Sequence, residues 1–287
     1  MTLTAPQRCS ALAEELDEPM VGTVQQRTRW LLIEDRSAWG HDAVGDLLGP
    51  EVSGVLKDPL PAVGRAGRGC GRSPSADVVR SVFLVDTAAA EMAVREVRTL
   101  TDLEASALAS MPVAEFGAPV PRPLFLVCSN GKRDACCAVR GRTLLTAMAA
   151  GHVAQTWECT HLGGHRFAAN LVCLPHGIVY GRVTAADGPR LADEYLAGRL
   201  DAASLRGRSA WPEAAQVAEH QVRLADGLRG VDDVGLVSIA IDNDRAEVTL
   251  AVRGRPRVVA LHATPLAPRT TSCRADEMEQ PVHWRVV

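Results

Sequence analysis

Aromatic residues make up only 4% of this 287-residue chain, and no apolar run approaches the ~18 residues of a membrane-spanning helix. The formal net charge is only −3, so composition gives no indication of general polyanion binding. So few aromatic rings also provide little surface on which nucleic-acid bases can stack. We therefore expect neither a nucleic-acid partner nor a membrane span.

Several familiar catalytic and nucleotide-binding patterns are also missing. No GxxxxGK[ST] motif occurs, and no GxGxxG lies between an expected strand and helix. C-x-x-C, HExxH, Ser-His-Asp and paired-carboxylate patterns are not evident either. The first twenty residues lack the basic region, apolar core and cleavage site of a signal peptide, so we expect a cytoplasmic location.

Eight cysteines in such a chain need an explanation. Structural disulfides are rare in the reducing cytoplasm, so the cysteines are more readily explained by metal-binding or redox roles. Cys9 lies in a polar N-terminal segment and is expected to be a free surface thiol. Cys159 and Cys173 lie in apolar strand contexts, where cysteine usually acts as a small buried residue.

Two short stretches collect the thiols and imidazoles that could bind a metal. In CSNGKRDACC eight residues lie between Cys128 and Cys137, and in WECTHLGGHRF three residues lie between His161 and His165. A [2Fe-2S] cluster needs four ligands, and imidazole can replace thiolate on one iron. Two cysteines and two histidines are also a tetrahedral zinc set. The pattern therefore predicts a metal centre.

The surrounding pattern predicts how the two loops meet. We expect a strand over Leu124–Cys128, a helix over Ala138–Ala150 and a strand over Val153–Cys159. A parallel α/β core would then place both loops at the same edge of the sheet. The glycine pair Gly163-Gly164 would allow a tight turn between the two histidines.

These stretches resemble the sucrase/ferredoxin-like family, whose cluster module is a thioredoxin-like ferredoxin. The resemblance is specific over residues 124–183 and looser through YLAGRL, LRGRS and the N-terminal WLLIEDRSAWG. It implies a [2Fe-2S] cluster held by Cys128, Cys137, His161 and His165. It also implies electron transfer, with a reductase and an unknown acceptor as protein partners.

The residues around these ligands both follow and depart from the family pattern. Arg133-Asp134 matches it, whereas Ala138 stands where we expect glycine, and Cys136 is a spare thiol that could replace Cys137. The residues expected to surround the ligands are Cys136, Arg133, Asp134, Gly163, Gly164, Arg166 and Asn170.

Three other interpretations stay open. Cys136 and Cys137 could run thiol-redox chemistry at a helix N-terminus, although adjacent cysteines form a strained ring when bonded. A structural zinc could occupy the Cys2His2 set within a binding module, or the site could be vestigial. The resemblance favours an electron carrier over a catalyst, and neutral histidine ligands would raise the reduction potential of the cluster.

The element order predicts an α/β protein in three parts. Residues 1–118 are expected to form an α/β region, 119–207 a thioredoxin-like module, and 208–287 a helix followed by strands. Within the module, residues 124–200 have the predicted order β-α-β-α-β-β-α, which is the thioredoxin-like order. In the first part, the Gly-, Pro- and Arg-rich residues 58–75 are expected to form a long loop. Its basic stretch 63–72 is a candidate docking surface for a redox partner. No internal repeat is evident.

Overall fold

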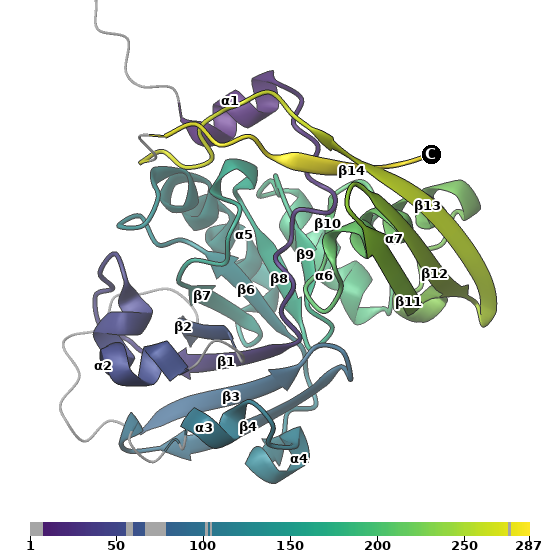
Figure 1. Ribbon diagram of the computed structural model, residues 1–287. Helices are drawn as coiled ribbons and strands as arrows, with labels where there is room; N and C mark the ends of the chain where they lie inside the picture. Colours follow the sequence, from purple (N-terminus) through teal and green to yellow (C-terminus); the bar gives the residue numbers. More distant parts are fainter. Residues whose placement is uncertain (1–7, 56–59, 67–78, 101–102, 104, 275–276) are drawn as a thin grey trace, which may run out of the picture.

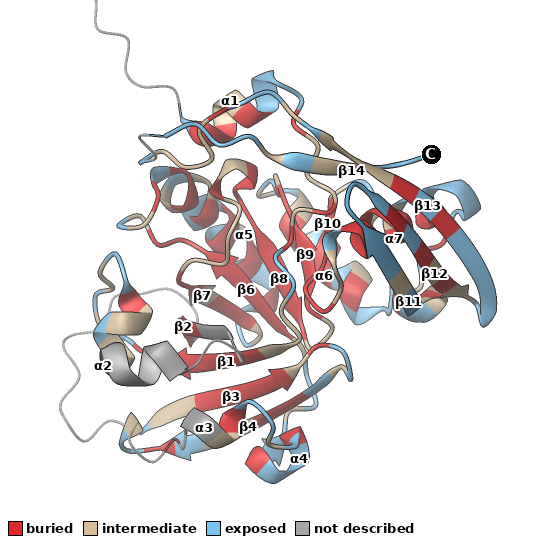
Figure 2. Cartoon of the chain, in the orientation of Figure 1, coloured by how far each residue is buried: buried red, intermediate tan, exposed pale blue. Residues whose placement is uncertain are grey.

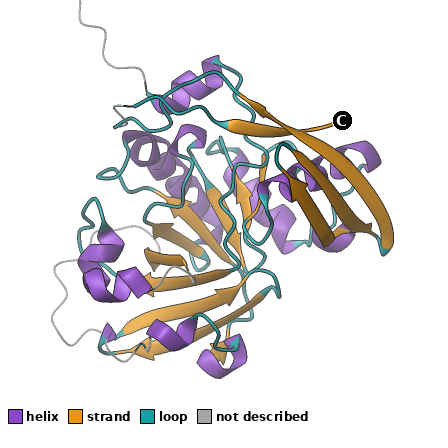
Figure 3. Ribbon diagram, viewed as in Figure 1, coloured by secondary structure: helices purple, strands orange, loops and turns teal. Residues whose placement is uncertain are grey.

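The structure is a computed structural model that describes residues 8–55, 60–66, 79–100, 103, 105–274 and 277–287. Most strands belong to one ten-stranded mixed sheet with helices packed on it, as Figures 1 and 3 show. Its strands are β1 (Arg29–Glu34), β2 (Leu60–Ala66), β3 (Arg80–Asp86), β4 (Glu91–Val97), β5 (Ala118–Pro119), β6 (Leu124–Cys128), β7 (Thr156–Cys159), β8 (Leu171–Leu174), β9 (Ile178–Tyr180) and β10 (Leu205–Arg208).

The helices follow the predicted α/β alternation. They are α1 (Cys9–Glu15), α2 (Ala43–Val55), α3 (Ala105–Leu108), α4 (Val113–Phe116), α5 (Arg142–His152), α6 (Asp187–Leu196) and α7 (Glu213–Asp226). Within the described ranges, none of them is long and apolar enough to cross a membrane. The predicted α/β fold class is therefore confirmed.

The large sheet has a palindromic strand order, β10-β9-β8-β6-β7-β2-β1-β3-β4-β5. In each half, the first two strands are parallel, and the third, fourth and fifth are added antiparallel. The halves meet where β2 and β7 pair antiparallel. The same five-strand topology therefore occurs twice in the large sheet. This repeat was not evident in the sequence.

The two halves share one of the protein's hydrophobic clusters. Phe125 and Val127 of β6 pack toward α5 and α6, while Leu126 and Cys128 pack on the other face beside Trp30 of the first half. All five residues of β6 are buried, as expected for a strand that is paired on both sides and covered on both faces. Figure 2 shows this buried centre in red.

The structure corrects the expected loop at 58–75 over residues 60–66, because the rest of that stretch lies outside the described residues. Residues 60–66 form β2, which pairs with β1 on one side and β7 on the other. Ala62 and Val63 are buried, and Arg65 is paired with Glu158 at 2.7 Å. Pairing on both sides orders a stretch whose composition alone favours a loop. Arg65 is therefore not a docking residue, and 67–72 lie outside the described residues.

The C-terminal part is the expected helix followed by strands. The second sheet is antiparallel and contains β11 (Val234–Asp242), β12 (Arg245–Val252), β13 (Arg255–Pro265) and β14 (Val282–Val286). Helix α7 packs on it through Ala218 and Val222. Between β13 and β14 the chain runs back across the molecule to lie beside α1 (Figure 1).

Candidate metal centre

The ends of two parallel strands bring the two predicted ligand loops together. Cys128, the last residue of β6, is in register with Cys159, the last residue of β7. Because the strands run in the same direction, the loops that follow them leave the same edge of the sheet. His161 lies two residues beyond β7 and therefore reaches the end of β6.

Cys137 reaches Cys128 from the start of a helix. A short π-helical turn, Cys137–Gly141, leads directly into α5. Gly141 in this turn lies against the backbone of Cys128, so closely that an added Cβ would strike the Cys128 carbonyl oxygen. The missing side chain at Gly141 is therefore what lets the helix start approach the end of β6. Nothing in the local sequence pattern distinguishes this glycine from the others.

The histidine loop turns where the glycine pair was expected to allow it. Gly163 and Gly164 have φ of 83° and 71°, values that L-residues with a side chain rarely adopt. The turn stacks the rings of His161 and His165, with centroids 3.9 Å apart and planes 15° apart. The backbone N–H of Gly163 donates to Nδ1 of His161 at 3.4 Å.

The four predicted ligands converge on one place. The ligand atoms of Cys128, Cys137 and His161 all lie within 4.8 Å of one another. His165 joins them through Nδ1, which is 3.5 Å from Sγ of Cys137. Cys128, Cys137 and His165 are buried, whereas His161 is half-exposed. By donor chemistry this set fits a [2Fe-2S] cluster with histidine ligands on one iron, and also a tetrahedral zinc ion.

The pKa values of these side chains favour the binding of a cation. A hydrogen bond from the Cys137 thiol lowers the pKa of Cys128 to about 5 and raises the pKa of Cys137 above its ordinary range. Burial lowers the pKa of His165 to about 3 and so keeps the imidazole neutral, as a ligand must be. Without a metal, the two cysteines therefore share a proton that a bound cation would displace.

A buried hydrogen-bond network holds the histidine loop. The side-chain amide of Asn170 donates to the carbonyl of Gly164 at 3.0 Å, and its oxygen accepts from Nη1 of Arg206 at 2.8 Å. Arg206 also donates to the carbonyl of Thr23 at 2.9 Å. Burial lowers the pKa of the Arg206 guanidinium to about 9. Asn170 was expected here; Arg206 was missed, although it lies within the LRGRS stretch.

The other residues expected around the ligands have different partners. Arg166 donates to Glu18 at 2.8 Å, and its guanidinium lies over the ring of Phe167. Arg133 contacts the ring of His41 from the first half at 3.3 Å. Neither side chain has a hydrogen bond to the predicted ligands among the described contacts.

Cys136 and Cys137 are adjacent in sequence but face different neighbours. Cys137 contacts His165, whereas Sγ of Cys136 is 3.6 Å from Sγ of Cys9 and 3.3 Å from Sγ of Cys273. Asp134 is also directed to this second group. The expectation that Cys9 is a surface thiol was wrong, because α1 packs onto this loop and leaves Cys9 only 1% exposed. Cys159 and Cys173 are buried as expected.

The sequence also matches a known protein family. The model of the family described as "Sucrase/ferredoxin-like" matches residues 20–207. The chain belongs to the sucrase/ferredoxin-like family. The four predicted ligands and the Arg206 network all lie inside the matched range.

One curated relative of this family member is a protein of Meyerozyma guilliermondii. It is described as "Altered inheritance of mitochondria protein 32" and is 35% identical over 81 residues, which cover 24% of this chain and 28% of the relative. The chain thus covers well under two thirds of that relative's length. No solved structure matches the chain.

Proposed function

We propose that this chain is a one-electron carrier that holds a [2Fe-2S] cluster with Cys128, Cys137, His161 and His165. The observation that carries the proposal is the convergence of these two thiols and two imidazoles at one sheet edge. The word "ferredoxin" in the family description agrees with it. When bound, such a cluster supplies reversible one-electron redox chemistry.

The protein's own residues limit how an electron would enter and leave. Three of the four ligands are buried and His161 is half-exposed, so a partner would approach over His161. Lys132 is exposed and Arg133 half-exposed on the neighbouring loop, where both add positive charge. We expect an acidic docking face on a reductase and on an acceptor, since complementary charge steers encounter.

The thiol-redox alternative has less support. In a disulfide the two sulfurs are about 2.05 Å apart and the cysteines face each other. Cys136 and Cys137 instead contact different partners. A Cys2His2 zinc site is the stronger rival, because the same donors satisfy it.

The decisive experiment is a visible absorption spectrum with EPR on anaerobically purified protein, before and after dithionite reduction. We expect a red-brown protein with about two iron atoms per chain and a Rieske-like reduced signal. His161→Cys and His165→Cys should keep the colour and shift the signal, whereas Cys173→Ala, outside the site, should change neither. A colourless protein that contains zinc and no iron would overturn the proposal.

A further inference from the structure

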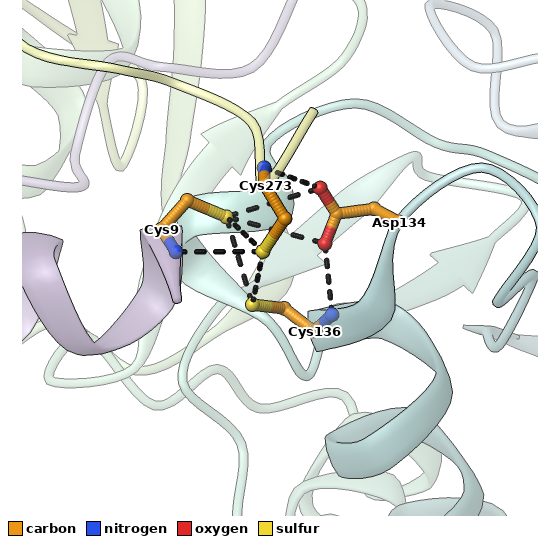
Figure 4. Close-up of side chains that lie close together, drawn as sticks. All are labelled: Cys9, Asp134, Cys136 and Cys273. Carbon is orange, nitrogen blue, oxygen red and sulfur yellow. Dashed lines mark hydrogen bonds between the residues drawn. The ribbon is translucent and has the colours of Figure 1, made fainter. Parts of the chain in front are cut away.

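A second group of side chains that could bind a metal ion lies next to the first, because Cys136 of one group is adjacent in sequence to Cys137 of the other. It joins Cys9 of α1, Asp134 and Cys136 of the loop after β6, and Cys273 of the segment between β13 and β14 (Figure 4). Their ligand atoms all lie within 4.8 Å of one another. Cys9 and Cys273 lie outside residues 20–207, so the family match covers only half of the group.

The distances suit one tetrahedral ion. A zinc ion bound to thiolates at about 2.3 Å holds pairs of sulfur atoms about 3.8 Å apart. Here the three Sγ–Sγ distances are 3.3, 3.5 and 3.6 Å. The carboxylate oxygens of Asp134 lie 3.9 and 4.0 Å from Sγ of Cys9 and complete a fourth corner.

The carboxylate is held in place for this role. Asp134 is fully buried and accepts hydrogen bonds from the backbone N–H of Cys136 at 2.8 Å and of Cys273 at 2.9 Å. The Ser272 hydroxyl donates to it at 3.1 Å. These donors are neutral and orient the carboxylate without cancelling its charge. Such supporting hydrogen bonds are typical of ligands at metal sites.

A disulfide accounts for this group less well. Three thiols leave one unpaired, and the closest pair would have to move from 3.3 Å to about 2.05 Å. The buried carboxylate would then remain beside the odd thiol. A divalent cation instead uses all four groups, and an oxygen ligand among the sulfurs favours zinc over the softer copper(I).

We propose that Cys9, Asp134, Cys136 and Cys273 form a structural zinc site that ties both ends of the chain to the loop carrying Cys137. The cysteine thiols lose their protons to solvent as the ion binds, and the divalent charge offsets two of the four negative charges. Because Cys136 and Cys137 are adjacent, the ion also fixes the loop that positions a ligand of the first site.

The test is the zinc and iron content of the full-length protein, purified without chelators and measured by plasma mass spectrometry. We expect about one zinc ion per chain at this site. Cys273→Ala and Cys9→Ala should each lose one zinc ion and keep the metal of the first site. Cys173→Ala, a buried cysteine in neither group, should lose nothing. The zinc content of these variants tests the second site. The [2Fe-2S] proposal is tested separately, by the iron content and the EPR signal.

A milder variant covers the case in which the cysteine variants do not fold. Ser272→Ala removes the hydroxyl that donates to Asp134 at 3.1 Å and accepts from the backbone N–H of Arg274 at 3.3 Å. We expect it to weaken zinc affinity about 10–100-fold in a competition with a chromogenic chelator. Wild-type protein in which this group binds no zinc and all three thiols alkylate readily would overturn the proposal. So would an intact mass that reveals a disulfide among the three cysteines.

Discussion

The substitution Gly141→Ala tests whether the candidate metal centre depends on the close approach of the helix start to β6. A methyl group there would strike the Cys128 carbonyl oxygen and lie 3.1 Å from its carbonyl carbon and 3.3 Å from Cα of Ser129. These are backbone atoms, so no side-chain rotation relieves the overlap. Either the turn at Cys137 or the end of β6 must move, which changes the Cys128–Cys137 separation.

We expect Gly141→Ala to destabilise the protein by about 1–3 kcal/mol, the usual range for overpacking a buried site. For a chain of this size, that corresponds to a melting temperature lower by roughly 2–10 °C. Metal content should fall as well, because two ligands no longer lie at the right distance. Thermal unfolding followed by circular dichroism, together with iron and zinc analysis, measures both effects.

Gly151→Ala is the matched control. Gly151 lies in α5, and an alanine Cβ there would meet no atom within 4 Å. Alanine at such a helical position stabilises a protein by about 0.4–1 kcal/mol. If Gly141→Ala matched this control in melting temperature and metal content, the reasoning about the turn would be refuted.

Three further predictions concern the support of the site and of the fold. Arg206→Met should leave buried acceptors unpaired, at about 1–3 kcal/mol for each, and speed metal loss to a chelator; release at the wild-type rate would argue against a positioning role. The pKa of His165 is about 3 in the folded protein and about 6.5 when unfolded, so the unfolded chain binds a proton first as pH falls. Metal-free protein should therefore lose stability from pH ~6.5 down to ~3, and His165→Gln should flatten this urea-midpoint profile; an equally steep profile would contradict the assignment. Glu219 accepts from Arg208 at 2.8 Å and Arg223 at 2.9 Å in the core, so Glu219→Ala should cost about 3–5 kcal/mol by urea unfolding, whereas the exposed Asp226→Ala should change little.

The palindromic sheet explains what the first half contributes to the site. Its first strand ends at Glu34, where the second half has Cys128. The loop after β1 then touches the loop that carries the ligands: the Asn130 side chain donates to the Gly40 carbonyl at 3.1 Å. The first half thus supports the candidate centre without supplying a thiol or imidazole to the four predicted ligands.

Features that depend on local pattern could be predicted from the amino-acid sequence alone. The apolar run Leu124–Cys128 predicted a buried strand that ends at a candidate ligand, and the Gly163-Gly164 pair predicted the tight turn that stacks two imidazoles. The spacing of the four predicted ligands needed no knowledge of distant contacts, because each pair brackets one short loop. The two loops follow parallel neighbouring strands, so their meeting could also be predicted.

Other features depend on contacts between distant segments and could not be predicted before the fold was known. Residues 60–66 form a strand because β1 and β7 pair with them, which outweighs a loop-like composition. Arg206 is recognisable as a support of the site only where folding brings it to Asn170. Cys9 and Cys273 are 264 positions apart, and their neighbourhood exists only because the two ends of the chain pack on one loop.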